Sequence, residues 1–417
     1  VDELIKACNL GVNKAKGQSK CKGPLSLSAE LRSMERMAPL KNVIVPLQSL
    51  LTPCLPSNGR PDEAHNPFPA KAVTIKEFHD TIDVLQSLMT PVVVRIKGSD
   101  GVLYKFLCKP KDDLRKDSRM MDLNTLINRL LVKDPDARRR NLHIRTFSVV
   151  PLNENNGLVQ WVNDTSVLRH ILNDLYTRNQ GPEVIKTTKI QEIYNTKTRP
   201  KGNLTLLELF QQELQPRFKP IFHKWFLETF KTPAKWVAAR NCYVRATAIW
   251  SMVGYIVGLG DRHSENILFD ATTGDCVHVD FSCLFNKGES LTVPERVPFR
   301  LTQNLIDPMG VSGYHGGFTN ICVVAMNVLR GNRDSLLNVL EAFLHDPLVE
   351  WIKRSSEEGQ KALSKCERRL QGGVTRFPTT RDITQVLSVD GQVRAVIAEA
   401  VEPYNLAEMY KWWMPWF

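Results

Sequence analysis

Three polar side chains in the second half of the chain follow one another in an order that suits phosphoryl transfer. Asp261 and Asn266 stand five residues apart in the run GLGDRHSEN, and Asp280 follows fourteen residues later in the run HVDF. Phosphoryl transfer needs a carboxylate to accept the proton of the attacking hydroxyl, and amide and carboxylate oxygens to hold Mg²⁺ against the phosphates. We therefore predict Asp261 as the general base and Asn266 and Asp280 as metal ligands.

His263 lies in the same run and could donate a hydrogen bond to the transferred phosphate or to Asp261. The alternative is that Asp261 and Asn266 only cap a turn, as Asp and Asn often do. A lone DxxxxN pattern would favour that alternative. The second Asp, placed in a short apolar strand, favours chemistry instead.

The order of these residues differs from that of ordinary protein kinases, which read His-Arg-Asp before the catalytic loop and Asp-Phe-Gly after it. Here the loop reads Asp-Arg-His and the second motif reads Asp-Phe-Ser at 280–282. This motif resembles that of the phosphatidylinositol 3-kinase-related protein kinases, whose catalytic loop has the form GxxDRHxxN. Runs that match one checkpoint branch of that family are 108–117, 142–147, 266–270, 283–289, 297–302 and 343–351.

The resemblance covers nearly the whole chain and implies a fold. We expect an α+β, two-lobed catalytic fold of the PI3/PI4-kinase type, with a small β-rich N-lobe, a large helical C-lobe and a C-terminal helical FATC segment. The expected divisions are 1–70 as the end of a preceding helical region and a Pro-rich connector, 71–163 as the N-lobe and hinge, 164–353 as the C-lobe, 354–384 as a mobile regulatory linker, and 385–417 as FATC.

The elements that would hold the nucleotide come earlier in the chain. Residues 92–96 and 102–108 read as two strands around a glycine-containing turn. By itself such a turn is more often an ordinary hairpin than a phosphate clamp. The family resemblance implies that Lys97, Gly98 and Ser99 form the short glycine loop over the phosphates.

A lysine is expected to follow this turn and pair with the phosphates. Lys105 and Lys109 lie on the same face of a strand with a period of two, so the local pattern leaves both open. The family motif aligns Lys109 with the ATP lysine and Asp117 with the carboxylate that orients it. Asp112 is the alternative carboxylate.

The segment VQWV at 159–162 resembles the hinge between the lobes of this family. The resemblance implies that Trp161 stacks on adenine and that the Val162 backbone hydrogen-bonds the adenine edge. An isolated Trp is more often a packing residue, but its position after two strands favours the adenine role.

Two helices are predicted from their apolar spacing. One has Ser118 as its N-cap and carries a single apolar face made of Met120, Leu123, Ile127, Leu130 and Leu131. The other covers 233–257, and Gly258 suits the left-handed turn that would end it and lead into the catalytic run.

The composition of the chain says less about its function than the motifs do. The chain has 417 residues, 42% of them hydrophobic, with a net charge of +11, so it is not a disordered chain. The basic residues are dispersed, and the basic run at 136–140 reads as a solvated helix end. Nine cysteines without a CxxC pair indicate reduced thiols and argue against a zinc site. We expect a soluble protein, and the initial Val1 suggests a piece of a longer polypeptide.

The resemblance implies an ATP-dependent serine/threonine protein kinase that uses Mg²⁺, with Mn²⁺ as a substitute. It implies Ser/Thr-Gln protein substrates, action in the nucleus in the DNA damage and replication stress checkpoint, a dedicated regulatory subunit, and activator proteins that bind the linker. It further implies contact with DNA only through the partner, no membrane, and a dimer of heterodimers.

Two alternatives remain. A phosphoinositide lipid kinase shares the fold, but it needs a basic activation segment, and 281–298 contains Lys287 and Arg296 beside Glu289 and Glu295. A catalytically dead scaffold would fit Ser282 where many relatives have Gly, although the catalytic residues are intact.

The C-terminus carries four aromatic residues within its last six, Trp412, Trp413, Trp416 and Phe417. An exposed apolar patch of this size is unusual on a soluble chain. We therefore predict that this tail is buried against the large lobe.

Overall fold

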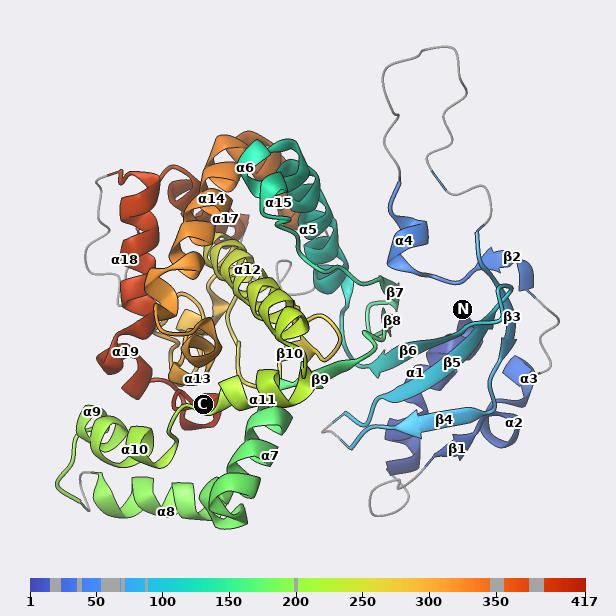
Figure 1. Ribbon diagram of the computed structural model, residues 1–417. Helices are drawn as coiled ribbons and strands as arrows, with labels where there is room; N and C mark the ends of the chain where they lie inside the picture. The colour runs from blue at the N-terminus through green and yellow to red at the C-terminus, as the bar shows by residue number, and fades with distance from the viewer. Residues whose placement is uncertain are drawn as a thin grey trace. The chain divides into compact units, whose positions relative to one another are not determined.

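The computed structural model describes residues 1–15, 24–35, 40–53, 68, 72–86, 89–198, 202–345, 356–374 and 386–417. The chain forms two compact units, one made of Val1–Thr125 with Thr146–Asn163 and the other of Leu126–Arg145 with Asp164–Phe417 (Figure 1). The first unit is built around a β-sheet and the second is mainly helical. The expected α+β fold with a β-rich and a helical lobe is confirmed. The connector predicted from Pro53 to Pro69 lies outside the described residues except for Pro53 and Phe68.

The first unit contains an eight-stranded antiparallel sheet in which β5 and β6 are central. Its strands are β1 (Leu25–Ser26), β2 (Leu40–Ile44), β3 (Thr74–Phe78), β4 (Thr81–Val84), β5 (Val92–Gly98), β6 (Leu103–Pro110), β7 (Val149–Asn153) and β8 (Asn156–Gln160). The main path runs β1-β4-β5-β6-β8-β7, and β3 pairs with both β2 and β5. Its helices are α1 (Asp2–Ala15), α2 (Leu27–Glu30), α3 (Arg32–Glu35) and α4 (Gln48–Leu51).

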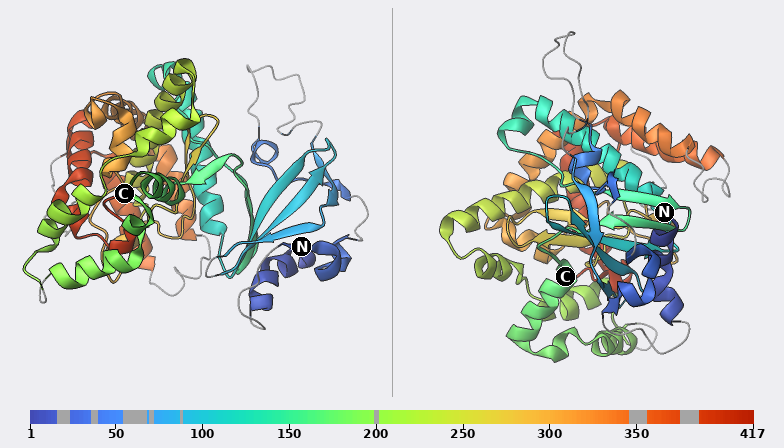
Figure 2. Two further views of the ribbon diagram at one scale, coloured as in Figure 1. Left: turned by 60° about the horizontal axis from the view of Figure 1, so that its bottom comes forward. Right: turned by 90° about the vertical axis from the view of Figure 1, so that its right-hand side faces the viewer.

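Alternation along β5 and β6 builds the core of this unit. Val94 of β5 and Phe106 and Cys108 of β6 are fully buried on one face, in a cluster with Cys8 of α1. Figure 2 shows α1 lying across this face of the sheet. Because side chains alternate along a strand, odd-numbered residues of β6 point to the opposite face.

Helix α5 (Arg115–Lys133) begins earlier than the sequence predicted. Ser118 is not its N-cap but lies within its first turn. The Asp113 carboxylate accepts hydrogen bonds from the backbone N–H of Arg115 at 3.2 Å and from its Nε at 2.8 Å, and so caps the helix one turn earlier. The apolar positions expected on one face are buried: Met120, Leu123, Ile127, Leu130 and Leu131.

The second unit is dominated by helices, with one small sheet. The longer helices are α7 (Leu168–Gln180), α8 (Thr187–Lys197), α11 (Phe222–Thr229), α12 (Pro233–Val257), α14 (Gly317–Gly331), α15 (Arg333–His345), α17 (Ser356–Leu370) and α18 (Val389–Val401). Shorter ones are α6 (Pro135–Arg139), α9 (Leu206–Leu209), α10 (Gln215–Arg217), α13 (Gln303–Ile306) and α19 (Pro403–Ala407). The antiparallel sheet contains β9 (Thr165–Val167), β10 (Ile267–Asp270) and β11 (Cys276–His278). None of the helices in the described part of the chain has the length and apolar character needed to span a bilayer.

Helix α12 spans the predicted residues and positions the catalytic run. The Thr232 side chain caps its N-terminus at the Lys235 N–H, and Pro233 occupies its first turn. Gly258 ends it with φ 61° and ψ 47°, a conformation that costs glycine little. Trp250 of α12 stacks on His278 of β11 with ring centroids 4.6 Å apart, so the helix also supports the small sheet.

Part of the expected mobile linker is a helix. In α17, Arg369 is only 4% exposed and donates to the Tyr255 carbonyl at 2.7 Å, with its guanidinium 4.8 Å from the Tyr255 ring. Residues 356–370 of the expected linker thus form a helix that packs on α12, and the mobility of the linker stays a prediction. Residues 354–355 and 375–384 of that linker lie outside the described residues.

Three of the four C-terminal aromatic residues are buried, as the sequence predicted, and Trp412 is partly exposed. Trp413, Trp416 and Phe417 are at most 4% exposed. Trp416 stacks on Phe218, with ring centroids 5.7 Å apart. Arg300 donates to the carbonyl oxygens of Trp413 at 2.7 Å, Met414 at 2.8 Å and Phe417 at 3.2 Å, and so holds the tail against the helical unit.

Candidate active site

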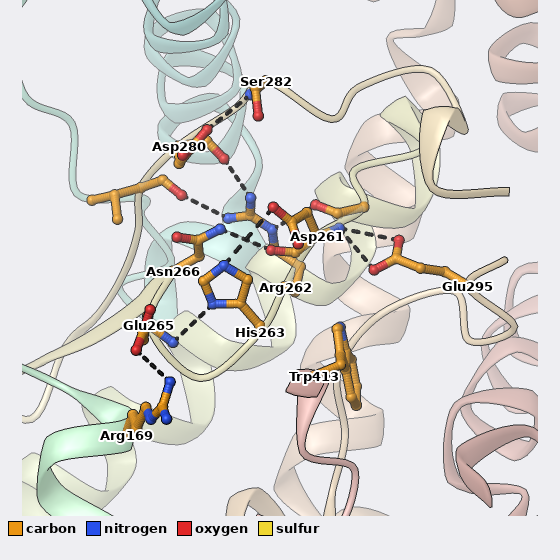
Figure 3. Close-up of polar contacts among 12 residues, drawn as sticks. Arg169, Asp261, Arg262, His263, Glu265, Asn266, Asp280, Ser282, Glu295 and Trp413 are labelled. Atoms are coloured by element: carbon orange, nitrogen blue, oxygen red, sulfur yellow. Dashed lines mark hydrogen bonds and ion pairs between the residues drawn. The ribbon is translucent and has the colours of Figure 1, made fainter. Parts of the chain in front are cut away.

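The small sheet explains how residues far apart in sequence share one end of the site. Because β10 and β11 are antiparallel, Ile267 at the start of β10 pairs with His278 at the end of β11. Asn266 immediately precedes β10, and Asp280 lies just after β11. The Val279 N–H donates to the Asn266 carbonyl at 3.1 Å, which closes this end of the hairpin. The two predicted metal ligands therefore lie together with Asp261 and His263 (Figure 3).

The backbone of Asp261 is held from both sides. Its N–H donates to the Glu295 carboxylate, at 2.9 Å from one oxygen and 3.1 Å from the other, and its carbonyl accepts from Asn266 Nδ2 at 2.9 Å. The Asp261 side chain is 41% exposed, so it can reach a substrate. Partial burial raises its carboxyl pKa, and the nearby His263 and Arg262 oppose that rise. A higher pKa makes the carboxylate a better proton acceptor.

His263 is arranged as a donor toward Asp261. Its Nδ1 accepts the Glu265 N–H at 3.1 Å, and its Nε2 lies 3.9 Å from Asp261 Oδ2. Burial lowers the pKa of the imidazole, although the Asp261 carboxylate opposes this. The neutral ring is therefore favoured, and since Nδ1 accepts a hydrogen bond, its proton belongs on Nε2.

Asn266 and Asp280 provide oxygens suited to Mg²⁺. The Asn266 side chain is nearly buried, and because its nitrogen is used on the Asp261 carbonyl, Oδ1 is the atom suited to a cation. One Asp280 oxygen accepts the Ser282 N–H at 3.2 Å. Within the described ranges, no three His, Cys, Asp or Glu side chains converge as a metal cage. Two protein oxygens fit Mg²⁺, which usually takes its other ligands from water and phosphate.

Arg262 ties the two motifs together, a role that the sequence did not suggest. Its side chain is 3% exposed and donates to the carbonyl oxygens of Gly260 at 2.9 Å, Val279 at 2.8 Å, and Asp280. The guanidinium therefore fixes the backbone of Asp280 relative to the catalytic loop. Glu295 was likewise missed, because the sequence offered only its charge. For Arg262, the only signal in the sequence was its position between the candidate residues Asp261 and His263.

The first unit contains the other predicted site residues. Lys109 Nζ lies 3.1 Å from Asp112 Oδ2, and the side chain is 20% exposed. Asp117 is buried in the first turn of α5. Lys105 is exposed on the same face of β6 as Lys109. The structure thus shows the Asp112 pairing that the sequence held as the alternative, while Asp117 remains the family-based assignment.

The predicted glycine loop is a tight turn between β5 and β6. Gly98 donates to the Val102 carbonyl, and a Cβ there would lie 2.6 Å from Val73 Cγ1. Ser99 Oγ accepts the Thr74 N–H at 3.1 Å. Lys97 pairs with Glu77 at 2.7 Å on the sheet surface.

The predicted hinge residues Trp161 and Val162 follow directly after β8. Trp161 is 36% exposed, and its N–H donates to the Lys105 carbonyl at 2.9 Å. Val162 follows, partly buried. An exposed aromatic face at this position is compatible with stacking on a base.

Comparison with known proteins places the chain in a family. The family described as "Phosphatidylinositol 3- and 4-kinase" matches residues 103–353, and the FATC domain matches residues 386–417. Over its whole length the chain is 48% identical to "Serine/threonine-protein kinase ATR" of Oryza sativa subsp. japonica and of Arabidopsis thaliana. It is 42% identical to "Protein kinase rad3" of Schizosaccharomyces pombe. The chain spans only 15–17% of the length of these relatives.

A solved structure shows the same fold. The "FAT and kinase domain of CtTel1" matches all of this chain and 28% of that one, with a TM-score of 0.78 and 28% sequence identity.

Proposed function

Because the chain belongs to the phosphatidylinositol 3- and 4-kinase family, we propose that it carries the catalytic and FATC parts of an ATP-dependent serine/threonine protein kinase of the ATR type. The observation that carries this proposal is the grouping of Asp261, His263, Asn266 and Asp280 at one end of the β10–β11 hairpin. The relatives named above, ATR and rad3, support the protein-kinase reading.

In the proposed reaction, Asp261 accepts the proton of the substrate hydroxyl. His263, with its proton on Nε2, donates to the Asp261 carboxylate or to the transferred phosphate. Asn266 and Asp280 hold Mg²⁺, or Mn²⁺ as a substitute, and the cation when bound neutralises phosphate charge. Arg262 keeps the Asp280 backbone in place beside the loop.

The first unit would bind ATP. We assign Lys109 to the phosphates, with Asp117 orienting it, and Trp161 and the Val162 backbone to adenine. The turn residues Lys97, Gly98 and Ser99 would cover the phosphates. The partly buried position of Lys109, against the exposed position of Lys105, supports the choice between the two lysines.

Substrate and partners follow from the relatives and are part of the proposal. The protein would phosphorylate Ser/Thr-Gln sites in the nucleus during the DNA damage and replication stress checkpoint. It would work with an ATRIP-type regulatory subunit, with activators at the regulatory linker and DNA reached through the partner, and without a membrane. We also propose a dimer of heterodimers, for which the solved "Complete CtTel1 dimer with C2 symmetry" supports only the dimeric state.

The lipid-kinase alternative has little support. Of the two basic residues that sequence offers in the activation segment, Arg296 lies 3.7 Å from Glu408 and stacks 5.8 Å from the Tyr404 ring. An arginine engaged with the FATC segment is poorly placed to bind an anionic head group. The dead-scaffold alternative requires a broken site, whereas the catalytic set is complete.

A phosphorylation assay with three substrates tests the proposal. In the whole polypeptide that carries this sequence, a Ser-Gln peptide should be phosphorylated well above a Ser-Ala peptide and above phosphoinositide vesicles. Asp280→Ala should abolish turnover, while Asp334→Ala, which changes an 83% exposed Asp, should not. Equal rates on the two peptides would remove the Ser-Gln assignment, and turnover of vesicles alone would favour the lipid kinase.

A further inference from the structure

The carboxylate of Glu295 reaches back from the activation segment to the catalytic loop. Although Glu295 lies 34 residues beyond Asp261, its oxygens accept the Asp261 N–H at 2.9 Å and 3.1 Å (Figure 3). The contact spans two segments that are far apart in the chain, and it is made to the backbone of Asp261 rather than to its side chain. This contact therefore ties the activation segment to the residue proposed as the base.

The backbone at Asp261 needs such support. Its φ is 58°, in the left-handed region that non-glycine residues seldom adopt. Such a conformation persists only where surrounding contacts fix it. Glu295 holds the N–H of this residue, and Asn266 holds its carbonyl at 2.9 Å. Because the side chain leaves from this backbone, these contacts set the direction of the Asp261 carboxylate.

Two glycines make room for the Glu295 carboxylate. A Cβ at Gly260 would lie 2.4 Å from Glu295 Oε2, and a Cβ at Gly288 would lie 2.0 Å from the same oxygen. The Glu295 N–H also donates to the Gly288 carbonyl at 3.0 Å. We call this arrangement of Gly260, Gly288 and Glu295 the glycine slot. It confines the carboxylate to the position from which it accepts the Asp261 N–H.

We propose that Glu295 is a positioning residue that fixes the Asp261 peptide and thereby aims the Asp261 carboxylate at the substrate hydroxyl. The inference rests on the proposed function, since it takes Asp261 as the general base. It makes an ordered activation segment a condition for a correctly placed base. Misplacing a reacting group by about 1 Å can cost on the order of 100-fold in rate.

Two conservative substitutions distinguish the effect of the position of the Glu295 carboxylate from the effect of its charge. Glu295→Gln keeps the reach of the side chain and an acceptor oxygen but loses the charge. Glu295→Asp keeps the charge but shortens the side chain by one methylene, so the carboxylate cannot reach the Asp261 N–H. Both are made in the whole polypeptide, and kcat and the KM for ATP are measured with a Ser-Gln peptide.

If Glu295 acts by position, Glu295→Asp lowers kcat by about 10- to 100-fold with little change in the KM for ATP. Glu295→Gln stays within about threefold of the wild-type rate, because one acceptor oxygen suffices for the bond. Glu289→Asp is the matched control. Glu289 lies in the same segment and pairs with Lys365 at 3.1 Å.

A second variant disturbs the contact between Glu295 and the Asp261 N–H without changing either residue. Gly288→Ala pushes a methyl group against Glu295 Oε2 and should lower kcat as Glu295→Asp does. Because both act on one contact, the double variant should be no slower than Glu295→Asp alone. If Glu295→Asp fails to fold, loss in Gly288→Ala with retention in Glu295→Gln decides for the inference.

The opposite ranking overturns the inference: an active Glu295→Asp with an inactive Glu295→Gln shows that charge matters and position does not. Equal losses in Glu289→Asp, or a parallel rise in the KM for ATP, show a general disturbance of the segment and also overturn it. Asp261→Ala in the same assay separates the two claims. If it turns over normally, the proposed base is wrong; if it is inactive while Glu295→Asp is normal, only the positioning role is wrong.

Discussion

Asp261 and His263 carry opposite pKa shifts with a common main cause. Burial raises the pKa of the carboxyl group and lowers that of the imidazole. Near neutral pH this favours a neutral ring with its proton on Nε2, 3.9 Å from Asp261 Oδ2 and so beyond direct hydrogen-bond distance. This is the protonation state that a general base with a neighbouring donor requires.

Replacing Asp261 by Ala should slow the chemical step and spare nucleotide binding. General acid–base catalysis contributes about 100- to 10,000-fold, so we expect a loss of kcat in that range. Single-turnover phosphorylation and ATP-analogue binding, measured side by side, check this. Lost nucleotide binding together with intact single-turnover chemistry would contradict the assigned role.

Lys109→Arg should weaken or misplace the ATP phosphates, because a planar guanidinium does not replace a compact ammonium. Lys105→Ala is the matched control on the same face of β6, where Lys105 is exposed and Lys109 is 20% exposed. ATP-dependent peptide phosphorylation is the measurement. If Lys105→Ala removes activity and Lys109→Arg does not, the assignment moves to Lys105.

Glu295 should make folding stability depend on pH. Removal from solvent raises its pKa from 4.5 to about 7, so the folded form holds a proton that the unfolded form has released. Protonation of Glu295 contributes fully to the free energy of unfolding below about pH 4.5. This contribution is lost as the pH rises to about 7, which lowers the free energy of unfolding by about 3 kcal/mol. Denaturant unfolding across this window should show Glu295→Gln with a flatter pH dependence than the wild type. Identical pH slopes would contradict the shift.

Elements with strong local signals could be predicted from the sequence. Helix α12 was bounded by Pro233 and Gly258, and β5 and β6 by their alternation around a glycine turn. The start of α5 was wrong because the Asp113 cap precedes Ser118. Helix α17 was not predicted, because its residues are polar and its contacts with the rest of the unit, such as Arg369 with Tyr255, are far apart in sequence.

The site residues also fall into those that the sequence could identify and those that it could not. Asp261, Asn266 and Asp280 could be named because their types and spacing reflect chemistry. The roles of Glu295 and Arg262 depend on contacts across 34 and 18 residues that no local pattern encodes. Such positions become visible only once the chain is folded.

The C-terminal tail should support the catalytic loop. Arg300 donates to the tail carbonyls and also to the Arg262 carbonyl at 3.3 Å, so one buried side chain joins the two. Deleting 412–417 would leave Arg300 without these acceptors and uncover Phe218. We expect lower kinase activity and faster proteolysis within 281–298.

Limited proteolysis with mass spectrometry locates the cuts, and the kinase assay gives the rate. Lys411→Ala is a milder control, since it removes a bond to Gln191 but leaves the tail in place. Full activity after the deletion would show that the tail is not part of the catalytic body.

The molecule as a whole consists of two units with separate cores and separate sets of site residues. Lys109, Asp117 and Trp161 belong to the sheet unit, and Asp261 and Asp280 to the helical unit. In the helical unit, residues 295–298, Arg369 of α17 and Glu399 of α18 line one small pocket of about 50 Å³. Helix α17 and the FATC segment therefore adjoin the segment that holds Glu295.

The glycine slot also has an evolutionary consequence. A side chain at position 260 or 288 would collide with the Glu295 carboxylate, so these three positions limit one another's substitutions. Selection should therefore treat them as a unit. Descendants of this sequence that replace Glu295 by a smaller residue gain freedom at Gly288, whereas a Cβ at Gly260 would still lie 2.9 Å from Cys283 Sγ. Those that keep Glu295 can acquire alanine or serine at Gly288 only after another change makes room, so the order in which such substitutions accumulate is constrained.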